Sequence, residues 1–283
     1  MTVRSWLYVP GDGGERLDKA NGRGADAVIA DLEDAVAEFA KDDAREAVAR
    51  WVRRGPPPGV QLWVRVNAGE AGFVDVDAVV AAGLTGVCVP KAAGGDELDR
   101  LDERIAGAER TAGLPIGDIR VVPLVESAQG LLAVPDLLRA PRVDQLQLGE
   151  VDLAADLGLD VDDTGLQLLH ARSTVVVASV AAGALPPPAA VSREFRDLRR
   201  FRDDTEALRR LGFVGRACIH PAQLAVAHEV FTPSAQQVAR ARAVVDRFDA
   251  ALGRGRAVAI DEDGRMIDEA VVRSARRVLG TPR

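Results

Sequence analysis

The sequence IRVVPLVESAQGLLAVPDLLRAPRVDQLQLGEVDLAADLG, residues 119–158, decides the fold of this chain. It contains two short apolar runs, 119–125 and 143–148, each bounded by turn residues. Runs of this kind are typical of buried parallel strands. Residues 128–138 between them have the length and composition of a helix, which is the usual crossover between two parallel strands. The stretch therefore predicts a strand–helix–strand unit whose two strands end at the same edge of a sheet.

Acidic residues follow both predicted strands directly. Glu126 comes after the first run, and Glu150 and Asp152 come after the second. Since the two strand ends meet at one edge, we predict that Glu126 and Asp152 lie within reach of one ion. Carboxylates without a neighbouring Cys or His suit a hard, oxygen-binding cation, so we predict Mg²⁺, with Mn²⁺ as the alternative. The competing interpretation is that each acid only caps the following helix, as Ser127 or Asp152 can.

Strand-like and helix-like segments alternate over residues 1–231. Strands are predicted at 5–9, 27–32, 60–66, 86–90, 119–125, 143–148, 187–191 and 214–219, and helices near 13–22, 41–53, 74–82, 95–112, 128–139, 164–183, 197–211 and 221–230. This alternation predicts an α/β protein with a (β/α)₈ TIM barrel over residues 1–231 as the catalytic domain. The strand at 187–191 is the weakest of these because prolines open it. A doubly wound open sheet is the structural alternative, but no Gly-x-Gly-x-x-Gly follows the first strand.

Residues 232–283 form a pattern that is not needed to complete a barrel. A helix is predicted at 235–252, a hairpin with an Asp-Gly turn at 257–267, and a last helix at 268–279. We therefore expect a C-terminal extension of hairpin and helices that packs on a neighbouring subunit. Because this extension is surplus to the barrel, we expect a homo-oligomer.

Composition excludes several classes of function. The formal net charge of −7 argues against a nucleic-acid partner, and no apolar run has the length of a membrane span. The N-terminus lacks the basic and apolar regions of a signal peptide, so we expect a cytoplasmic protein. Cys88 and Cys218 lie inside apolar runs and are predicted to be buried free thiols. Three scattered histidines do not make a zinc site, although His220 follows a strand and is a candidate to support the active site.

The residues after the barrel strands are expected to face the active site. In chain order they are the glycine-rich turn 10–14, the acids Asp31, Glu33 and Asp34, then Arg65, Lys91, Glu126 and Asp152. An arginine at such a place can grip a substrate carboxylate bidentately. A divalent ion on two carboxylates can polarise a 2-oxo acid and stabilise an enolate. This set of residues predicts cleavage or formation of a carbon–carbon bond next to a carbonyl group, whereas helix caps and salt bridges explain only one or two of the positions.

The same residues lie in motifs that resemble those of the HpcH/HpaI aldolase family. The similarity is to its citrate lyase β-subunit-like members, which are related to malyl-CoA and citramalyl-CoA lyases. The motifs are RSWLYVPGD at 4–12, DLEDAV at 31–36, RVN at 65–67, PK at 90–91, PLVESAQG at 123–130, DLAADLG at 152–158, IHP at 219–221 and GRMID at 264–268. They cover nearly the whole chain and are specific to the family, but not to one substrate.

The resemblance implies a role for each matching residue. Glu126 and Asp152 would be the Mg²⁺ ligands, with Glu33 and Asp34 supporting the metal through water. Arg65 would bind the carboxylate of the acid half of the substrate.

The resemblance also implies residues that bind CoA and move a proton. Arg16 and Lys19 would meet the phosphates of CoA, and Gly149 would contact substrate or CoA. Asp268 would complete a neighbour's active site as its acid and base. The homo-oligomer that this requires would be a trimer. Without the resemblance, an ordinary N-cap is the preferred interpretation of Asp268.

The resemblance further implies the reaction and the partners. We expect a Mg²⁺-dependent lyase that cleaves or forms a 3-hydroxyacyl-CoA thioester of the malyl, citramalyl or citryl type. The products would be acetyl-CoA, or a related acyl-CoA, and a 2-oxo acid. One alternative is a CoA-independent, metal-dependent aldolase that releases pyruvate, and another is a subunit that is active only within a larger complex.

Overall fold

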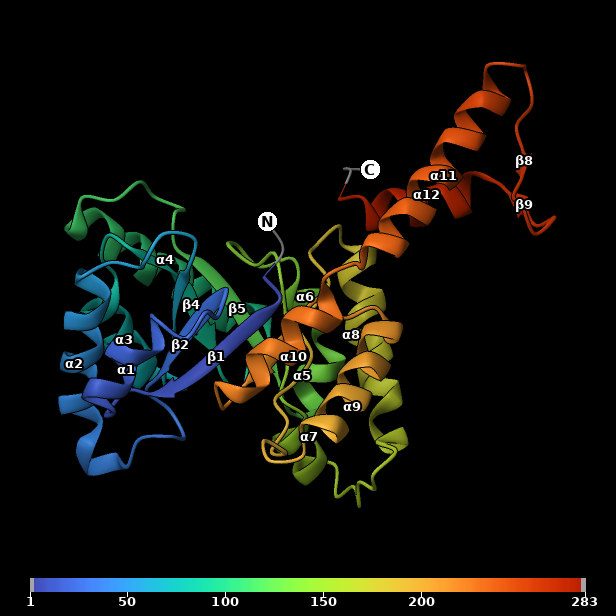
Figure 1. Ribbon diagram of the computed structural model, residues 1–283. Coiled ribbons are helices and arrows are strands. Elements are labelled where there is room, and N and C mark those ends of the chain that lie inside the picture. The colour runs from blue at the N-terminus through green and yellow to red at the C-terminus, as the bar shows by residue number, and fades with distance from the viewer. Residues whose placement is uncertain (1–2, 281–283) are drawn as a thin grey trace. The chain divides into compact units, whose positions relative to one another are not determined.

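The computed structural model describes residues 3–280 and divides into two compact units, Met1–Phe231 and Thr232–Arg283. Figure 1 labels the helices and strands of both. Within the described residues, no helix combines the length and the apolar character that crossing a membrane requires.

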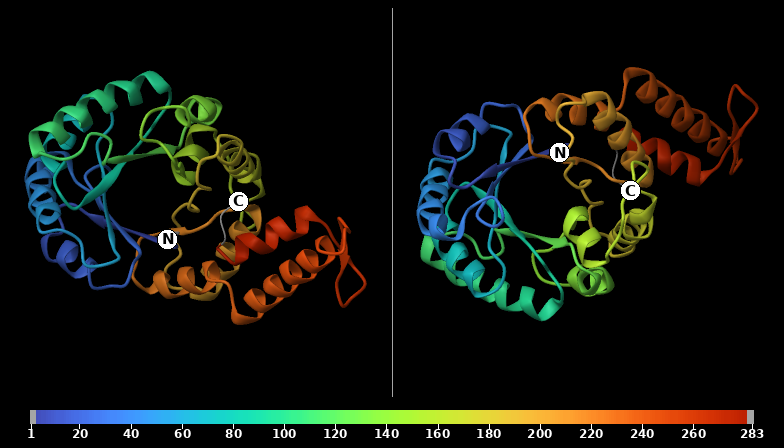
Figure 2. Two further views of the ribbon diagram at one scale, coloured as in Figure 1. Left: turned by 90° about the horizontal axis from the view of Figure 1, so that it is seen from above. Right: turned by 90° about the horizontal axis from the view of Figure 1, so that it is seen from below.

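The first unit is a parallel sheet that curls into a barrel, with helices around its outside (Figure 2). The strands are β1 Ser5–Pro10, β2 Ala27–Asp31, β3 Gln61–Arg65, β4 Leu84–Val89, β5 Arg120–Val125, β6 Gln147–Leu148 and β7 Arg216–Cys218. They are hydrogen-bonded in the order β6-β5-β4-β3-β2-β1-β7. Neighbours that follow one another in sequence pair in parallel, and a helix connects each pair, as in βαβ units. The predicted TIM-barrel fold is confirmed.

Helices follow the strands as the sequence pattern indicates. They are α1 Gly14–Ala20, η1 Glu38–Ala40, α2 Lys41–Arg53, α3 Glu70–Val79, α4 Gly95–Ala112, α5 Ala128–Leu132, α6 Val134–Leu137, α7 Glu150–Asp156, η2 Leu166–Leu168, α8 Leu169–Ala181, α9 Leu198–Leu211 and α10 Ala222–Phe231. The predicted helix at 128–139 is two short helices, because Pro135 cannot donate the backbone hydrogen bond of a continuous helix. It is instead the second residue of α6, in the first turn, where no such bond is needed. The short helix α7 was not predicted.

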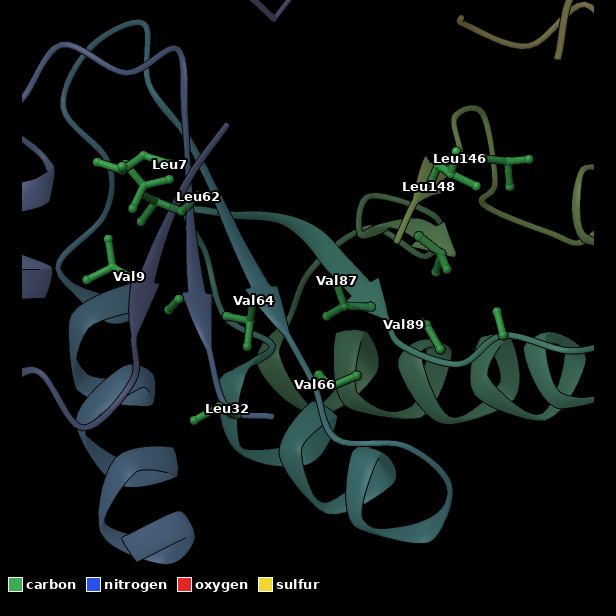
Figure 3. Packing of buried hydrophobic residues seen from close by; sticks show 14 of the residues in the cluster. Leu7, Val9, Leu32, Leu62, Val64, Val66, Val87, Val89, Leu146 and Leu148 are labelled. Atoms are coloured by element: carbon green, nitrogen blue, oxygen red, sulfur yellow. The ribbon is translucent and has the colours of Figure 1, made fainter. Parts of the chain in front are cut away.

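The core has two layers because side chains alternate along each strand. In β1, Leu7 and Val9 join the large cluster between the sheet and the helices, part of which is shown in Figure 3. Trp6 belongs to a second cluster, formed by the opposite face of the strands, where its ring centroid lies 5.1 Å from that of Trp63. Cys88 is in this second cluster, and it is a buried free thiol like Cys218, as predicted. Burial raises the pKa of each cysteine to about 12, so neither is a thiolate at neutral pH.

The predicted strand at 187–191 is wrong as a regular strand. Only Ala189 forms a β-bridge there, to Arg216, and its N–H donates to Gly215 O at 2.8 Å. Residues 186–188 are prolines, which have no N–H to contribute to a ladder. The segment still lies between β7 and the residues before β6, because Leu185 N donates to Asp144 O at 2.7 Å. The barrel is therefore completed there by an irregular segment.

The second unit contains α11 Ala235–Leu252, the antiparallel strands β8 Ala259–Ile260 and β9 Met266–Ile267, and α12 Glu269–Val278. Ser234 and Gln237 form a capping box at the start of α11. Phe248, Ile267 and Val272 make a small apolar cluster of their own. The helix–hairpin–helix order agrees with the order predicted from the sequence.

Candidate active site

A cavity of about 420 Å³ opens at the carboxyl ends of the strands of the first unit. Its lining includes Tyr8, Val9, Pro10, Asp31, Asp34, Ala35, Arg65, Leu124, Glu126, Gln147, Leu148, Gly149, Glu150, Val151, Asp152, Val191 and Ile219. Five of these are acids and one is basic. The strand ends thus bring together most of the residues that the sequence marked, as expected for this fold.

Arg65 is held by two acids of β2 and the loop after it. Its Nε and Nη2 donate to the two carboxylate oxygens of Asp31 at 2.7 and 2.6 Å, and its Nη1 lies 2.8 Å from Glu33 Oε2. Its guanidinium also lies over the ring of Tyr8, 5.5 Å from the centroid. Burial acts to lower the pKa of Arg65, but Asp31 outweighs it and holds this pKa above its ordinary value.

This arrangement corrects one detail of the prediction. The bidentate face of Arg65 binds Asp31 and not an incoming carboxylate. The cause is strand register, since Asp31 and Arg65 are direct partners in the β2–β3 ladder. Nη1 is the nitrogen that Asp31 does not bind, and it lies 2.8 Å from Glu33 Oε2 and 3.8 Å from the exposed carboxylate of Asp34.

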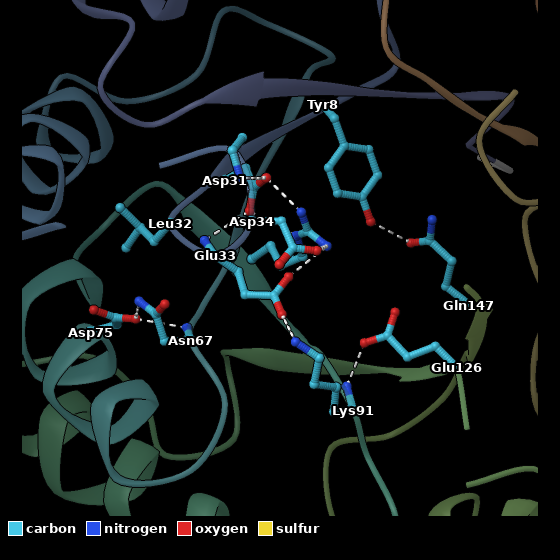
Figure 4. A network of polar contacts seen from close by, with 12 residues as sticks. Tyr8, Asp31, Leu32, Glu33, Asp34, Asn67, Asp75, Lys91, Glu126 and Gln147 are labelled. Atoms are coloured by element: carbon cyan, nitrogen blue, oxygen red, sulfur yellow. Dashed lines mark hydrogen bonds and ion pairs between the residues drawn. The ribbon is translucent and has the colours of Figure 1, made fainter. Parts of the chain in front are cut away.

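Glu126 is buried at the end of β5 and is positioned by backbone. Its Oε1 accepts a hydrogen bond from Lys91 N at 2.6 Å, and Lys91 has a φ of 53°. Figure 4 shows Lys91 between two acids, because its Nζ also lies 2.7 Å from Glu33 Oε1. Burial raises the pKa of Glu126 to about 7, with the charges of Asp152 and Glu33 adding to the effect and the Lys91 hydrogen bond opposing it.

Gly149 packs directly on Glu126. A Cβ atom at Gly149 would lie 2.4 Å from Glu126 Oε2 and 2.6 Å from Glu126 Cβ. Gly149 N donates to Val125 O at 2.9 Å. The predicted substrate-binding residue Gly149 thus lines the cavity and also leaves space for a carboxylate.

Helix capping does not account for Glu126 or Asp152. The cap of α5 is Ser127, whose Oγ accepts from Gly130 N at 3.0 Å. The N-cap of α7 is Gly149, and Asp152 lies in the first turn of that helix, in the same cavity as Glu126. The structure therefore supports convergence of the two carboxylates on one space.

Glu150 also lines the cavity, but it has a different partner. Arg172 of α8 donates to its two carboxylate oxygens at 2.7 and 2.6 Å, and both side chains are largely buried. The pair is neutral as a whole, so Glu150 does not add a free carboxylate to the cavity.

The donor set fits Mg²⁺. It consists of oxygens alone. Burial, with smaller contributions from the charges of Asp152 and Glu33, raises the pKa of Glu126, and a bound cation would favour the ionised carboxylate. In the part of the chain that the structure describes, no cluster of three or more His, Cys, Asp or Glu side chains is arranged around one metal position. Two carboxylates are sufficient for Mg²⁺, which ordinarily keeps several waters and substrate oxygens in its coordination shell.

A buried polar network behind the acidic loop was not predicted. Lys41 Nζ donates to Leu32 O at 3.0 Å, to Glu33 O at 3.1 Å and to Asn67 Oδ1. Asn67 in turn donates through its N and Nδ2 to Asp75 Oδ2 at 2.8 and 2.7 Å. The rarity of lysine was a signal for this network in the sequence, because the chain has only three lysines among its basic residues. Two of them, Lys41 and Lys91, bind the loop at 31–34.

Several predicted residues do not reach this cavity. Arg16 and Lys19 lie exposed on α1, where they pair with Asp12 at 3.4 Å and Glu15 at 2.8 Å. His220 stacks on Phe195 with 5.2 Å between ring centroids, beside the cavity residue Ile219.

Asp268 lies in the second unit. It is the N-cap of α12, and its Oδ1 accepts from Val271 N at 3.0 Å. The interpretation of Asp268 as a helix N-cap is therefore confirmed.

Comparison with known proteins gives consistent matches. A family model described as HpcH/HpaI aldolase/citrate lyase matches residues 4–221. The citrate lyase subunit beta-like protein of Deinococcus radiodurans is 34% identical, over 98% of this chain and 96% of that protein. A (3S)-malyl-CoA thioesterase of Cereibacter sphaeroides is 33% identical, over 98% and 93% of the two chains. The crystal structure of CitE from Mycobacterium tuberculosis, in complex with magnesium, acetoacetate and coenzyme A, is similar with a TM-score of 0.78, 30% identity, and coverage of 99% of this chain and 97% of that one. This chain belongs to the HpcH/HpaI aldolase/citrate lyase family and is an enzyme of that lyase type.

Proposed function

We propose that this enzyme is a Mg²⁺-dependent lyase of 3-hydroxyacyl-CoA thioesters of the malyl, citramalyl or citryl type. It would release acetyl-CoA, or a related acyl-CoA, and a 2-oxo acid, or catalyse the reverse condensation. The observation that carries the proposal is the meeting of Glu126, Asp152 and Arg65 in one cavity at the strand ends. The similar CitE structure, with magnesium, acetoacetate and coenzyme A bound, supports both the metal and the thioester.

In the cleavage direction, the bond between C2 and C3 of the acyl chain breaks. The C3 hydroxyl loses its proton and becomes the oxo group, while C2 takes a proton and becomes the methyl group of the acyl product. When bound by Glu126 and Asp152, Mg²⁺ would supply Lewis-acid polarisation of the oxygen on C3.

The side chains around the metal position have distinct tasks in this proposal. Arg65 Nη1 binds the free carboxylate of the acid half, while Asp31 and Tyr8 fix the guanidinium plane. Lys91 holds Glu33 through its ammonium group and Glu126 through its backbone N–H.

Asp268 is the proposed proton carrier for C2, supplied by the C-terminal unit of a neighbouring subunit. Its Oδ1 caps α12, which leaves Oδ2 to take and return a proton. This role requires a homo-oligomer, for which a trimer is proposed. Arg16 and Lys19 are proposed contacts of the CoA phosphates, since both are exposed cations on the helix that follows β1.

The first test is Glu126→Ala and Asp152→Ala, with Asp160→Ala as the control because Asp160 is an exposed acid outside the cavity. Loss of a ligand is expected to lower activity by more than the ~10- to 100-fold typical of residues that only support a metal. Calorimetric titration with Mg²⁺ should show the same loss in metal binding. A fully active double variant of Glu126 and Asp152 would refute the proposal.

The CoA-independent aldolase makes a different prediction. It has no need of Arg16, Lys19 or Asp268, so neutralising all three would leave its activity intact. For the thioester lyase, the triple variant is expected to lose acetyl-CoA binding and turnover while keeping Mg²⁺ and 2-oxo acid binding. Activity of the purified chain alone would exclude dependence on a larger complex.

A further inference from the structure

The helix that carries Asp152 is short and makes few apolar contacts. It is α7, which has seven residues, and Leu153 is the one that is buried. A helix of about two turns has little stability of its own in water, because forming its first turn is costly. Asp152 itself is exposed on the first turn. The position of its carboxylate therefore depends on contacts that fix α7 from outside.

One such contact joins the first residue of α7 to α8. Arg172 Nε and Nη2 donate to the two carboxylate oxygens of Glu150 at 2.7 and 2.6 Å, and both side chains are largely buried. Ala171 and Val175 anchor the same stretch of α8 in the core. Bidentate pairing fixes the relative direction of the two groups as well as their distance. The pair therefore orients the start of α7 against a longer helix that is packed in the core.

A second contact joins the last residue of α7 to the segment that follows Glu126. Asp156 Oδ2 accepts a hydrogen bond from Ala128 N at 2.7 Å. Ala128 is the first residue of α5 and lies two positions after Glu126. The N–H of a first-turn residue has no partner within its own helix, so the carboxylate satisfies it. This hydrogen bond links the two segments that carry the proposed metal ligands directly to each other.

We propose that Arg172 and Asp156 are positioning residues for the metal site. By fixing α7 at both ends, they set the distance between the carboxylates of Glu126 and Asp152, and this fixed distance favours Mg²⁺ over Ca²⁺. The inference rests on the proposed function, in which these two carboxylates are the metal ligands. Mg²⁺ requires near-ideal octahedral geometry with oxygens at about 2.0–2.1 Å, whereas Ca²⁺ accepts variable geometry at about 2.3–2.6 Å. Ligands held at a fixed separation can relax little around the larger ion.

The test measures binding of Mg²⁺ and of Ca²⁺, each alone, to the full chain by calorimetry. Asp156→Ala removes the acceptor for Ala128 N, and we expect Mg²⁺ affinity to fall at least ~10-fold. Ca²⁺ affinity should fall less, so that the preference for Mg²⁺ over Ca²⁺ drops at least about threefold. Asp156→Asn loses the same charge but keeps an oxygen that can accept from the N–H, so it should retain the preference. Asp160→Ala, at an exposed acid outside the cavity, should change neither affinity.

Arg172→Lys gives an independent test at the other end of α7. Lysine keeps a positive charge for Glu150 but lacks the planar fork that donates in parallel to both carboxylate oxygens. The preference for Mg²⁺ over Ca²⁺ should fall, as in Asp156→Ala. Arg210→Lys is the matched control, because it makes the same change in an exposed pair with Glu206 on α9. Circular dichroism checks that each variant is folded during the titration, and the Asp156 variants decide the proposal if Arg172→Lys does not fold.

The outcomes separate this inference from the proposed function. An unchanged ratio of the two affinities in Asp156→Ala would overturn the inference. Equal effects of Asp156→Ala and Asp156→Asn would also overturn it, because they would show that the charge of Asp156 matters and its hydrogen bond does not. An unchanged ratio in folded Arg172→Lys would overturn the role of Arg172. These results would leave the lyase proposal intact, whereas full Mg²⁺ binding by the double variant Glu126→Ala and Asp152→Ala would overturn both.

Discussion

Gly149 lies against the carboxylate of Glu126 so closely that a methyl group on Gly149 would stand 2.4 Å from Glu126 Oε2. Gly149→Ala must therefore displace Glu126, and we expect Mg²⁺ affinity to fall at least ~10-fold, with a loss of about 1–3 kcal/mol in the free energy of unfolding. Calorimetry with Mg²⁺ and urea denaturation measure the two effects. Gly107→Ala is the control, because a Cβ there meets only the far end of the Arg110 side chain, at 3.7 Å. Retention of full Mg²⁺ affinity in Gly149→Ala would show that Glu126 is not a ligand.

The raised pKa of Glu126 makes the stability of the metal-free protein depend on pH. A carboxyl whose pKa rises from 4.5 to about 7 on folding binds its proton more tightly in the folded state. The protonated carboxyl therefore adds to the free energy of unfolding. This contribution is complete below about pH 4.5 and is lost as the pH rises through about 7, which lowers the free energy of unfolding by roughly 3 kcal/mol at most. Urea denaturation in EDTA between pH 5 and pH 8 measures this fall. Glu126→Gln should abolish this part of the dependence and be more stable than the natural protein at pH 8, although inactive; an unchanged pH profile in that variant would contradict the assignment.

Lys41 is expected to position the acidic loop from behind. Lys41→Met removes hydrogen bonds to Leu32 O, Glu33 O and Asn67 Oδ1, and we expect a loss of about 2–3 kcal/mol in the free energy of unfolding. Lys19→Met is the stability control, since its exposed pair with Glu15 is worth less than ~0.5 kcal/mol. Because the loop carries Glu33, a rise in the Kd for Mg²⁺ should accompany the loss of stability. Equal stabilities of the two variants would show that the network contributes nothing.

The ion pair of Glu150 and Arg172 allows the cost of an unpaired buried charge to be measured, because a second substitution can remove that charge. Arg172→Met leaves a largely buried carboxylate without its partner, and such changes cost about 3–5 kcal/mol. Adding Glu150→Gln removes the unpaired charge and should restore at least half of that loss. Thermal or urea unfolding of both variants measures the difference. A double variant no more stable than Arg172→Met alone would mean that lost packing, and not the charge, sets the cost.

The sequence predicted the site best where an apolar run ends directly in acidic residues, because this pattern marks both the strand and its carboxyl end. Apolar runs followed by acid correctly predicted β5. Glu126 and Asp152 both line one cavity, and their reach to a single ion stays a prediction. The register between strands was not predicted. It places Asp31 beside Arg65, and Asp31 then accepts the two hydrogen bonds that Arg65 would otherwise donate to a substrate carboxylate. Pairing across strands depends on tertiary alignment, which one strand's own pattern does not contain.

Two further differences have local physical causes. A strand was predicted at 187–191 because eight strands complete a (β/α)₈ barrel. The prolines at 186–188 have no N–H groups to donate to a neighbouring strand, so the segment is irregular. The contacts of Lys41 span 9, 8 and 26 positions in sequence and depend on how α2 packs beside the strand ends. Hydrogen bonds of this kind, from one side chain to distant backbone and side-chain oxygens, leave no periodic signal in a sequence.

The irregular segment before Val191 has a consequence for how the family diversifies. Val191 follows Ala189, whose β-bridge to Arg216 is isolated, and Ile219 follows directly after the short strand β7. Substitutions here disturb little of the ladder that holds the barrel together, whereas those at Asp31 or Glu126 disrupt the core of the site. Val191 and Ile219 both line the cavity, so selection for a new substrate can act on them at small cost to folding. Homologues that share the acids of the strand ends are therefore expected to differ first at these two positions.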